Sequence, residues 1–328
     1  MKKIILILLV CLMFVCGCGK SDEKDIVKNL KDNIKNSYLL EGSLSMTNND
    51  DVYNYDVSVS YKKDNYYKVS LTNTSNNHTQ VILKNDDGVY IVTPSLNKSF
   101  KFQSDWPYDN SQIYLLEALV NDIERDSDYQ FIEEDDNYVF KTKVDYPNNK
   151  MLNHQKLVFD KDMELEKVLV FDSNDILRME LDIDNIEYAP TFKDNYFDLN
   201  TLIKTFDEAE VVESAKIDDS IFPLFVPSGT KLSNSEIIKT DVGERLIMTF
   251  DGDKPFLLVE ETADVMDEFT IIPTYGEPYM LIDTLGVVTD NSLSWSSNGI
   301  DYYLVSDVMG KDELVEIARS ISSIPALK

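Results

Sequence analysis

The thiols are the residues whose type and spacing most clearly predict chemistry. All three cysteines of the 328-residue chain, Cys11, Cys16 and Cys18, lie within its first eighteen positions. A thiolate is a nucleophile, so a cysteine at the end of an export signal can attack a lipid donor. Only Cys18 follows a small residue, Gly17, which gives a peptidase access to the backbone. We therefore expect Cys18 to be the modified thiol and the mature chain to contain no other.

The segment before Cys18 is typical of a secretory signal. A pair of lysines precedes an apolar run of twelve residues at positions 4–15. A membrane-spanning helix needs about 20 apolar residues, so this run is too short, and no later segment approaches that length. Residues 15–18, "VCGC", resemble a bacterial lipobox and predict a lipoprotein signal over residues 1–17. The expected location is the outer face of the cytoplasmic membrane, with the chain anchored through lipidated Cys18. The alternative is an ordinary signal peptide with incidental cysteines.

The rest of the sequence offers little for catalysis. The two histidines, His78 and His154, lie in unrelated strand regions without a nearby cysteine, so the spacing of a zinc site is absent. Acidic clusters at residues 133–136, 182–184 and 251–253 lack the spacing of a calcium-binding EF-hand loop and fit solvated turns and strand faces better. Paired carboxylates for glycoside hydrolysis stay open in so acidic a chain, but no segment singles any out. We therefore expect no enzyme, no metal and no cofactor.

The charge of the chain restricts its partners. The 59 acidic residues outnumber 31 lysines and arginines, which gives a net charge of −28 at pH 7. Without Lys2 and Lys3 the balance is 29 against 59, or −30. This charge repels nucleic acid and anionic lipid headgroups. Attachment to a membrane must then come from acyl chains rather than from a basic patch.

The elements that would position a site are mostly strands. A helix is expected over Ser21 to Ser37, with an apolar stripe along one side. After it, large and polar residues alternate, as they do from Tyr53 to Lys62, which places the large ones on one sheet face. The recurrence of this pattern between Tyr38 and Tyr188, with turn residues between the runs, predicts about eleven strands. These strands are expected to form one large antiparallel sheet.

One helical segment interrupts the strands, "SDWPYDNSQIYLLEALVNDIERD", from Ser104 to Asp126. It is apolar on most of its circumference, so it must be covered on most of its circumference. We expect it to lie inside a strongly curved sheet or to cap one. The stripe expected to pack on the sheet consists of Ile113, Leu116, Val120 and Ile123. The candidates for contact with an apolar ligand are Trp106, Tyr114, Leu115 and Leu119.

The pattern changes near residue 205. Residues 207–217 are acidic and weakly patterned, and Pro223 and Pro227 then punctuate the chain. Beyond them, short strands precede a last helix over Lys311 to Ser320, which predicts a small α+β module. The expected domains are residues 18–204 and 205–328, after the signal at 1–17.

The chain resembles a known family. The resemblance covers Tyr38 to Tyr188 and is most specific in "VTPSLNKSFKFQSDWPYDNSQIYLLEALVNDI", from Val92 to Ile123. This part is similar to the LolA-like lipoprotein carriers and their relatives in Gram-positive sporulating bacteria, including the germination lipoprotein GerS. Residues 205–328 resemble the small C-terminal module often joined to such domains, as in RseB. The resemblance implies a mainly β, α+β fold, in which a half-open antiparallel β-barrel with a helical lid carries a small C-terminal α+β domain. In the carriers, its interior accommodates acyl chains.

Two functional classes stay open from the sequence. In the first, the protein binds a lipid or the acyl chains of a lipoprotein. In the second, it docks an envelope protein, such as a cell-wall amidase or a signalling protein, during sporulation or germination. An ordinary packed core explains the apolar strand faces as well as a ligand cavity does.

Overall fold

The computed structural model describes residues 19–48, 51–147, 149–206, 216–217, 222–281 and 284–322. Cys18 and nearly all of the acidic segment at 207–217 lie outside these ranges. Their expected roles, as lipid anchor and domain linker, therefore stay predictions.

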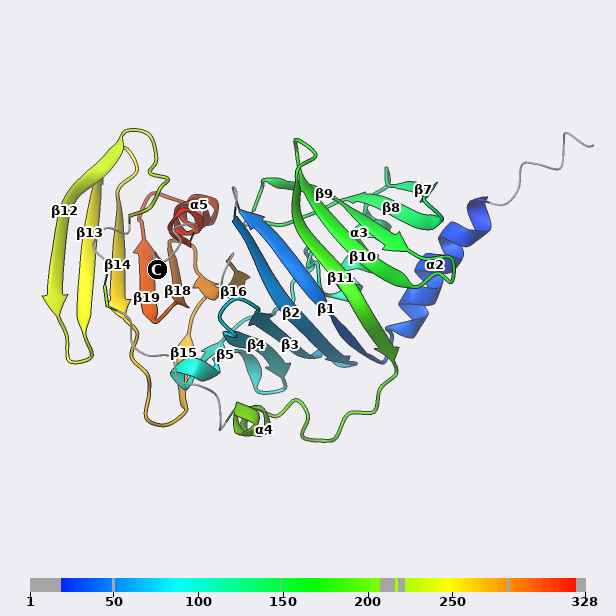
Figure 1. Cartoon of the computed structure of the whole chain (residues 1–328), viewed down its shortest axis with the longest axis horizontal. Helices are drawn as coiled ribbons and strands as arrows, with labels where there is room; N and C mark the ends of the chain where they lie inside the picture. Colours follow the sequence, from blue (N-terminus) through cyan, green and yellow to red (C-terminus); the bar gives the residue numbers. More distant parts are fainter. Residues whose placement is uncertain are drawn as a thin grey trace, which may run out of the picture.

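A strongly curved sheet dominates the described chain (Figure 1). It contains twelve strands in the spatial order β15-β6-β5-β4-β3-β2-β1-β11-β10-β9-β8-β7. Each pair of neighbours is antiparallel except β15 and β6, which are parallel. The first eleven strands are β1 (Ser37–Asn48), β2 (Asp51–Lys62), β3 (Tyr66–Asn73), β4 (Thr79–Asn85), β5 (Gly88–Thr93), β6 (Lys98–Phe102), β7 (Gln130–Glu134), β8 (Asn137–Lys143), β9 (Leu152–Phe159), β10 (Leu165–Asp172) and β11 (Leu177–Tyr188). Both the expected number of strands and their antiparallel arrangement are confirmed.

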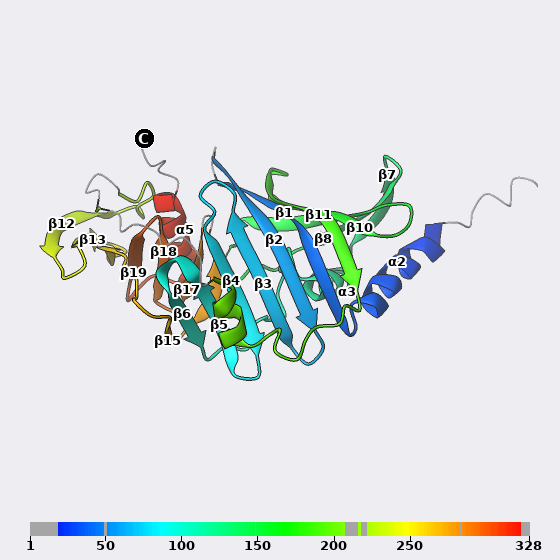
Figure 2. The same ribbon diagram turned by 60° about the horizontal axis from the view of Figure 1, so that its bottom comes forward.

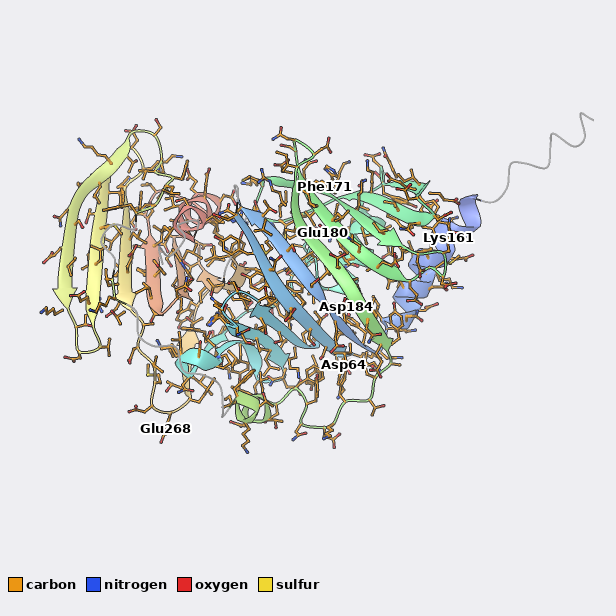
Figure 3. The ribbon with its side chains drawn as sticks, in the orientation of Figure 1. Asp64, Lys161, Phe171, Glu180, Asp184 and Glu268 are labelled. Carbon is orange, nitrogen blue, oxygen red and sulfur yellow. The ribbon has the colours of Figure 1, made fainter. Side chains whose placement is uncertain are left out.

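Alternation of large and polar residues sets the register of this sheet. Tyr38 of β1 lies opposite Tyr61 of β2, and both rings belong to the face that carries the apolar core. Carboxylates such as Glu180 and Asp184 lie on the outer face of β11 (Figure 3). A bulge follows Glu41, where a Cβ on Gly42 would stand 2.3 Å from the carbonyl oxygen of Asp182. The close approach of β1 and β11 therefore requires glycine at this position.

Two helices cover the concave face of the curved sheet, α2 (Gly19–Asn33) and α3 (Leu116–Arg125). Figure 2 shows α2 at one end of the curved sheet, with α3 close to it. From α2, Ile26 and Leu30 are buried in the same core as Leu116 and Ile123 of α3. Burial of apolar side chains between helix and sheet is the main stabilising term in such an arrangement. The expected place of the apolar helix, inside a curved sheet, is confirmed.

The boundaries of both helices differ from the expected ones. The α3 helix begins at Leu116, so Tyr114 and Leu115 precede it instead of forming its first turn. Leu115, the residue before the helix, supplies no side-chain cap; instead, the hydroxyl of Tyr38 accepts a hydrogen bond from the N–H of Leu116 at 3.3 Å. A cap supplied by a distant strand leaves no local sequence signal. The α2 helix ends at Asn33, and the expected last residue, Ser37, already begins β1.

Part of the outer face of the sheet is also covered. After β11 the chain crosses this face and forms α4 (Leu199–Ile203), followed by the short turn η2 (Lys204–Phe206). Phe197 and Leu202 pack there against the outward side chains of β4 and β5, including Leu83 and Tyr90. The chain thus covers β4 and β5 on both faces, which explains their nearly continuous burial.

The C-terminal part forms a second sheet, of seven strands in the order β12-β13-β14-β19-β18-β17-β16. Its core packs against α5 (Lys311–Ser322). The strands of this part, with β15, are β12 (Thr230–Lys239), β13 (Glu244–Gly252), β14 (Phe256–Thr262), β15 (Thr270–Thr274), β16 (Glu277–Met280), β17 (Leu285–Val288), β18 (Ser292–Ser297) and β19 (Ile300–Val305). The mainly β, α+β fold class expected from the sequence is confirmed.

The two parts are joined at several points. The strand β15, which lies within the expected C-terminal domain, extends the first sheet beside β6. Buried Gln80 of β4 accepts hydrogen bonds from the N–H of Leu285, at 2.6 Å, and from the hydroxyl of Thr284, at 2.9 Å. The ammonium group of Lys98 lies 3.2 Å from a carboxylate oxygen of Asp301. Within the ranges that the structure describes, no helix is long and apolar enough to cross a membrane.

Candidate functional site

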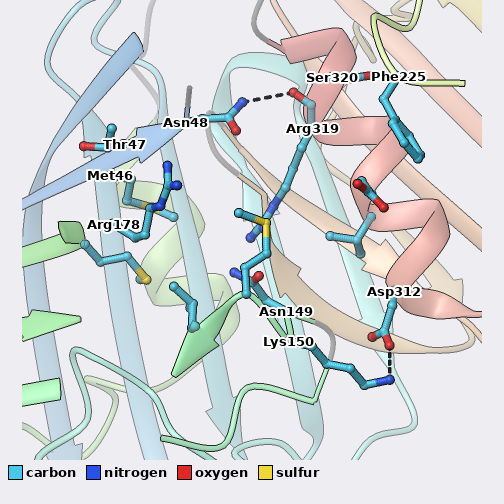
Figure 4. A pocket seen from close by; sticks show the side chains of 15 residues that line it. Met46, Thr47, Asn48, Asn149, Lys150, Arg178, Phe225, Asp312, Arg319 and Ser320 are labelled. Atoms are coloured by element: carbon cyan, nitrogen blue, oxygen red, sulfur yellow. Dashed lines mark hydrogen bonds and ion pairs between the residues drawn. The ribbon is translucent and has the colours of Figure 1, made fainter. Parts of the chain in front are cut away.

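The candidate site is a cleft between the two sheets. Its outer part, here the outer groove, has a volume of about 420 Å³. The end of β1 and the starts of β9 and β11 form one wall, and α5 with Phe225 forms the other. Figure 4 shows these two walls and the side chains between them. The groove therefore exists only because α5 packs beside the open end of the curved sheet.

The cleft continues inward beneath the segment that precedes α3. This inner pocket has a volume of about 80 Å³ and is bounded by Trp106 and Tyr114. Several residues border both the outer groove and the inner pocket, so the two lie next to each other. The shared residues are Met46, Asn149, Leu152, Met179 and Arg319.

The walls of the cleft are suited to an apolar ligand. Met46 and Met179 are register partners on β1 and β11, so their side chains lie together at the mouth of the inner pocket. Methionine is unbranched and polarisable, and it adapts to irregular apolar shapes. Aromatic rings at the inner end provide large flat surfaces. A concave site with mostly apolar walls and a few polar groups is the usual form of a small-molecule pocket.

Charged groups line the mouth of the outer groove. The ammonium group of Lys150 forms an ion pair with Asp312 of α5, which joins the two walls. A guanidinium nitrogen of Arg178 lies 2.7 Å from a carboxylate oxygen of Asp172. A guanidinium nitrogen of Arg319 donates to the hydroxyl of Tyr279 at 3.3 Å. The outer groove therefore combines charged groups with apolar ones, and two charged residues, Glu277 and Arg319, also border the inner pocket.

A row of aromatic rings lies under α3, the helix that covers the concave face and is called the lid below. The ring centroids of Tyr38 and Tyr61 are 5.3 Å apart, those of Tyr61 and Tyr67 5.0 Å, and those of Tyr67 and Trp106 5.7 Å. The carboxyl group of Glu117 lies among these rings, where burial raises its pKa from 4.5 to about 7. One of its oxygens accepts a hydrogen bond from Tyr38 at 2.9 Å, and the other is buried without a partner. Glu117 is thus a titratable group held in an apolar core.

A second pocket, of about 300 Å³, lies at another junction of the two sheets. Phe100 of β6 and Trp295 of β18 contribute apolar walls to it. Gln80 and Lys98 border it as well, and both already bind residues of the second sheet. The polar groups of this pocket are used in contacts between the two sheets, so it is the weaker candidate for a ligand site.

The structure places the predicted ligand residues in two groups. Trp106 and Tyr114 border the inner pocket of the cleft. Leu115 and Leu119 are buried in the core of the first sheet and do not border any of the three pockets described above. None of these observations tests binding by the four residues. The anchor residue Cys18 lies outside the described ranges.

Sequence reasoning missed the methionines of the cleft and the contribution of α5. Met46 and Met179 were visible only as members of apolar strand faces. Arg319 lies on a helix that was correctly expected, but nothing in the sequence indicates that this helix packs beside the first sheet. The histidines lie elsewhere. His78 is half-buried, and this desolvation lowers its pKa. The ring of His154 stacks on that of Phe171, with the ring centroids 5.1 Å apart. Among the residues described, no group of three or more metal-ligating side chains occurs.

The fold and the cleft define a two-sheet, mainly β protein with a cleft between its parts. The model of the family described as "Sporulation protein YdcC-like" matches residues 1–197. "Sporulation protein YdcC" of Bacillus subtilis (strain 168) is 37% identical over 328 residues, which cover 98% of this chain and 97% of the relative. The chain therefore belongs to the YdcC-like family of sporulation proteins.

Three solved structures are distantly similar. The Pseudomonas aeruginosa MucA/MucB complex matches 90% of this chain and 98% of its own, with 13% identity and a TM-score of 0.34. A putative outer membrane lipoprotein-sorting protein domain from Vibrio parahaemolyticus matches 56% and 100%, with 11% identity and a TM-score of 0.29. The Clostridioides difficile CwlD amidase in complex with the GerS lipoprotein matches 52% and 96%, with 17% identity and a TM-score of 0.23.

Proposed function

We propose that this protein is a non-catalytic binding protein of the cell envelope, and that the cleft takes up an apolar ligand, either a lipid or the acyl chain of a lipoprotein. The observation that carries this proposal is that the outer groove and the aromatic inner pocket lie next to each other and share five lining residues. A ligand with one alkyl chain could enter beside α5 and extend past Met46 and Met179 to Trp106. Membership of a sporulation protein family makes sporulation the natural setting.

We further propose that the protein acts at the outer face of the cytoplasmic membrane, anchored by lipid on Cys18. The anchor precedes α2 immediately, so the curved sheet stays near the membrane from which a lipid would come. Cys18→Ala should release the protein or leave its precursor uncleaved. Unchanged membrane association together with an unchanged mass of the variant would contradict the anchor.

Binding by the cleft is testable with two matched substitutions. Met151 is 53% exposed and borders the outer groove, whereas Leu232 is 39% exposed on β12 in the second sheet. Replacement of either by aspartate leaves the core intact, so both variants should unfold within about 0.5 kcal/mol of the parent chain. Met151→Asp should weaken displacement of a hydrophobic dye by dodecanol roughly tenfold, because it puts a charge in the path of an alkyl chain.

Leu232→Asp serves as the control and should bind dodecanol like the parent chain. Equal binding by all three chains would show that the alkyl chain does not use the outer groove. A complete lack of displacement in the parent chain would refute uptake of an apolar ligand.

The second candidate function is docking of an envelope protein, and the edge strand β12 favours it. This strand is ten residues long and almost wholly exposed, with Leu232, Ile237 and Ile238 open to solvent. Such an edge is a template for pairing with a strand from another chain. Purification of the anchored protein discriminates the two functions: lipid in the organic extract supports the first, and one stoichiometric protein supports the second.

A further inference from the structure

Arg319 differs from the other three arginines of the chain. The guanidinium groups of Arg125, Arg178 and Arg245 each lie within 3.3 Å of a carboxylate oxygen. Arg319 has no carboxylate within 4.0 Å among the residues that the structure describes. A net charge of −28 makes an unpaired arginine the exception in this chain.

Arg319 also lies at the junction of the outer groove and the inner pocket. It borders both the outer groove and the inner pocket, so its side chain lies where the two meet. Figure 4 shows this side chain extending from α5 toward the opposite wall. Its Nε atom is buried and has no hydrogen-bond partner. A buried donor without an acceptor costs free energy, and a ligand oxygen at this position would recover it.

The surroundings of Arg319 leave its charge available. Its polar partner, Tyr279, is a phenol whose pKa burial raises, so it stays neutral. Of the two acidic residues of α5 that border the groove, Asp312 is paired with Lys150. The other, Glu316, is exposed to solvent and lies outside ion-pair distance of Arg319. Glu277, which borders the inner pocket, is paired with Lys311, so none of the described carboxylates around the cleft forms an ion pair with Arg319.

We infer that the cleft binds a single-chain amphiphile with an anionic head, whose alkyl chain lies along the apolar walls of the cleft and whose acid group pairs with Arg319. A guanidinium group presents a planar set of donors that matches a carboxylate or a phosphate, and such charge-assisted bonds are stronger inside a protein than in water. This inference rests on the proposed binding function and adds the class of the ligand. The bond to a charged head at Arg319 would distinguish an acid from a neutral lipid of equal chain length.

The test compares ligands that share one alkyl chain, titrated calorimetrically into the chain from residue 19 onward, which contains every described residue. Dodecanoate should bind at least roughly tenfold more tightly than dodecanol, because one charge-assisted hydrogen bond separates them. Arg319→Gln should remove this preference while the affinity for dodecanol stays unchanged, and Arg319→Lys should restore part of it. Arg245→Gln, which removes a paired arginine of β13, is the control and should keep the preference. Dodecyl phosphate in a third arm shows whether the acid is a phosphate or a carboxylate.

The outcomes separate this inference from the function on which it rests. Equal affinity for dodecanoate and dodecanol in the parent chain overturns the role of Arg319 and leaves the apolar cleft standing. An Arg319→Gln variant that binds dodecanoate and dodecanol equally less tightly also overturns it. The residue would then shape the cleft without recognising the acid group. Absence of binding by all three ligands overturns the proposed function itself.

Discussion

The phenol of Tyr38 in β1 donates a 2.9 Å hydrogen bond to the carboxylate of Glu117 in α3. The phenol oxygen of Tyr38 also accepts a hydrogen bond from the N–H of Leu116 at 3.3 Å. Tyr38 therefore caps α3 and binds the first acidic side chain of this helix. One strand residue therefore fixes where the lid begins and how it sits over the concave face. This contact makes the position of the lid sensitive both to mutation and to pH.

Stability should depend on the protonation of Glu117. Burial raises the pKa of this carboxyl group from 4.5 to about 7 in the folded protein. Below pH 4.5 both states are protonated, and between pH 4.5 and about 7 only the unfolded chain releases the proton. The free energy of unfolding should thus fall as pH rises through this window, by up to about 3 kcal/mol from this group. Glu117→Gln should flatten the profile in urea titrations; an unchanged slope would contradict the assignment.

Removal of the Tyr38 hydroxyl should destabilise the lid. Tyr38→Phe leaves Glu117 and the N–H of Leu116 without their partner, which should cost about 1 to 3 kcal/mol. Tyr61→Phe is the matched control, because this ring stacks beside Tyr38 but is only half-buried. Chemical denaturation of both variants measures the difference. Equal loss in the two would mean that the capping contact contributes nothing.

Gln80 should hold the two sheets together. Gln80→Leu roughly keeps the volume of the side chain but deprives the buried N–H of Leu285 of its acceptor, at a cost of about 1 to 3 kcal/mol. Limited proteolysis should then cut faster near the junction of the two parts. Gln103→Leu, at an exposed position beyond β6, should change stability by no more than about 0.5 kcal/mol. Unaltered proteolysis of Gln80→Leu would show that other contacts suffice.

Leu119 should behave as a core residue. The sequence suggested that it contacts an apolar ligand, because the helical segment is apolar on most of its circumference. The side chain is fully buried, like that of Leu116. Leu119→Ala and Leu116→Ala should therefore both cost about 2 to 5 kcal/mol. A thermal melt of Leu119→Ala that matches the parent chain would restore the ligand-contact interpretation for this residue.

The sequence predicted the strands well because their signal is local. Alternation from Tyr53 to Lys62 sets the two faces of β2 without reference to the rest of the chain. The last helix and most short strands of the C-terminal part were also expected. The helix α3 was placed too early, because its cap comes from Tyr38, 78 residues away. The edge strand β12 is exposed on both faces and so lacks the alternation that marks the other strands.

The site was much less predictable than the fold. Trp106 and Tyr114 were selected for their place beside an excessively apolar segment, and both border the inner pocket. The opposite wall comes from α5, about 200 residues later in the sequence. The residue pattern of neither segment predicts that the two lie close together. Likewise, the parallel pairing of β15 with β6 depends on a crossing between the two parts that local patterns do not encode.

The most direct test of the account asks whether an alkyl chain reaches the inner end of the cleft. The chain has two tryptophans: Trp106 at the inner pocket and Trp295 at the second pocket. Single-tryptophan variants, Trp295→Phe and Trp106→Phe, would be titrated with 12-bromododecanoate, whose bromine quenches nearby indole fluorescence. We predict saturable quenching of Trp106 in the first variant and no quenching of Trp295 in the second. Quenching of Trp295 alone, or of neither ring, would contradict a ligand site in this cleft.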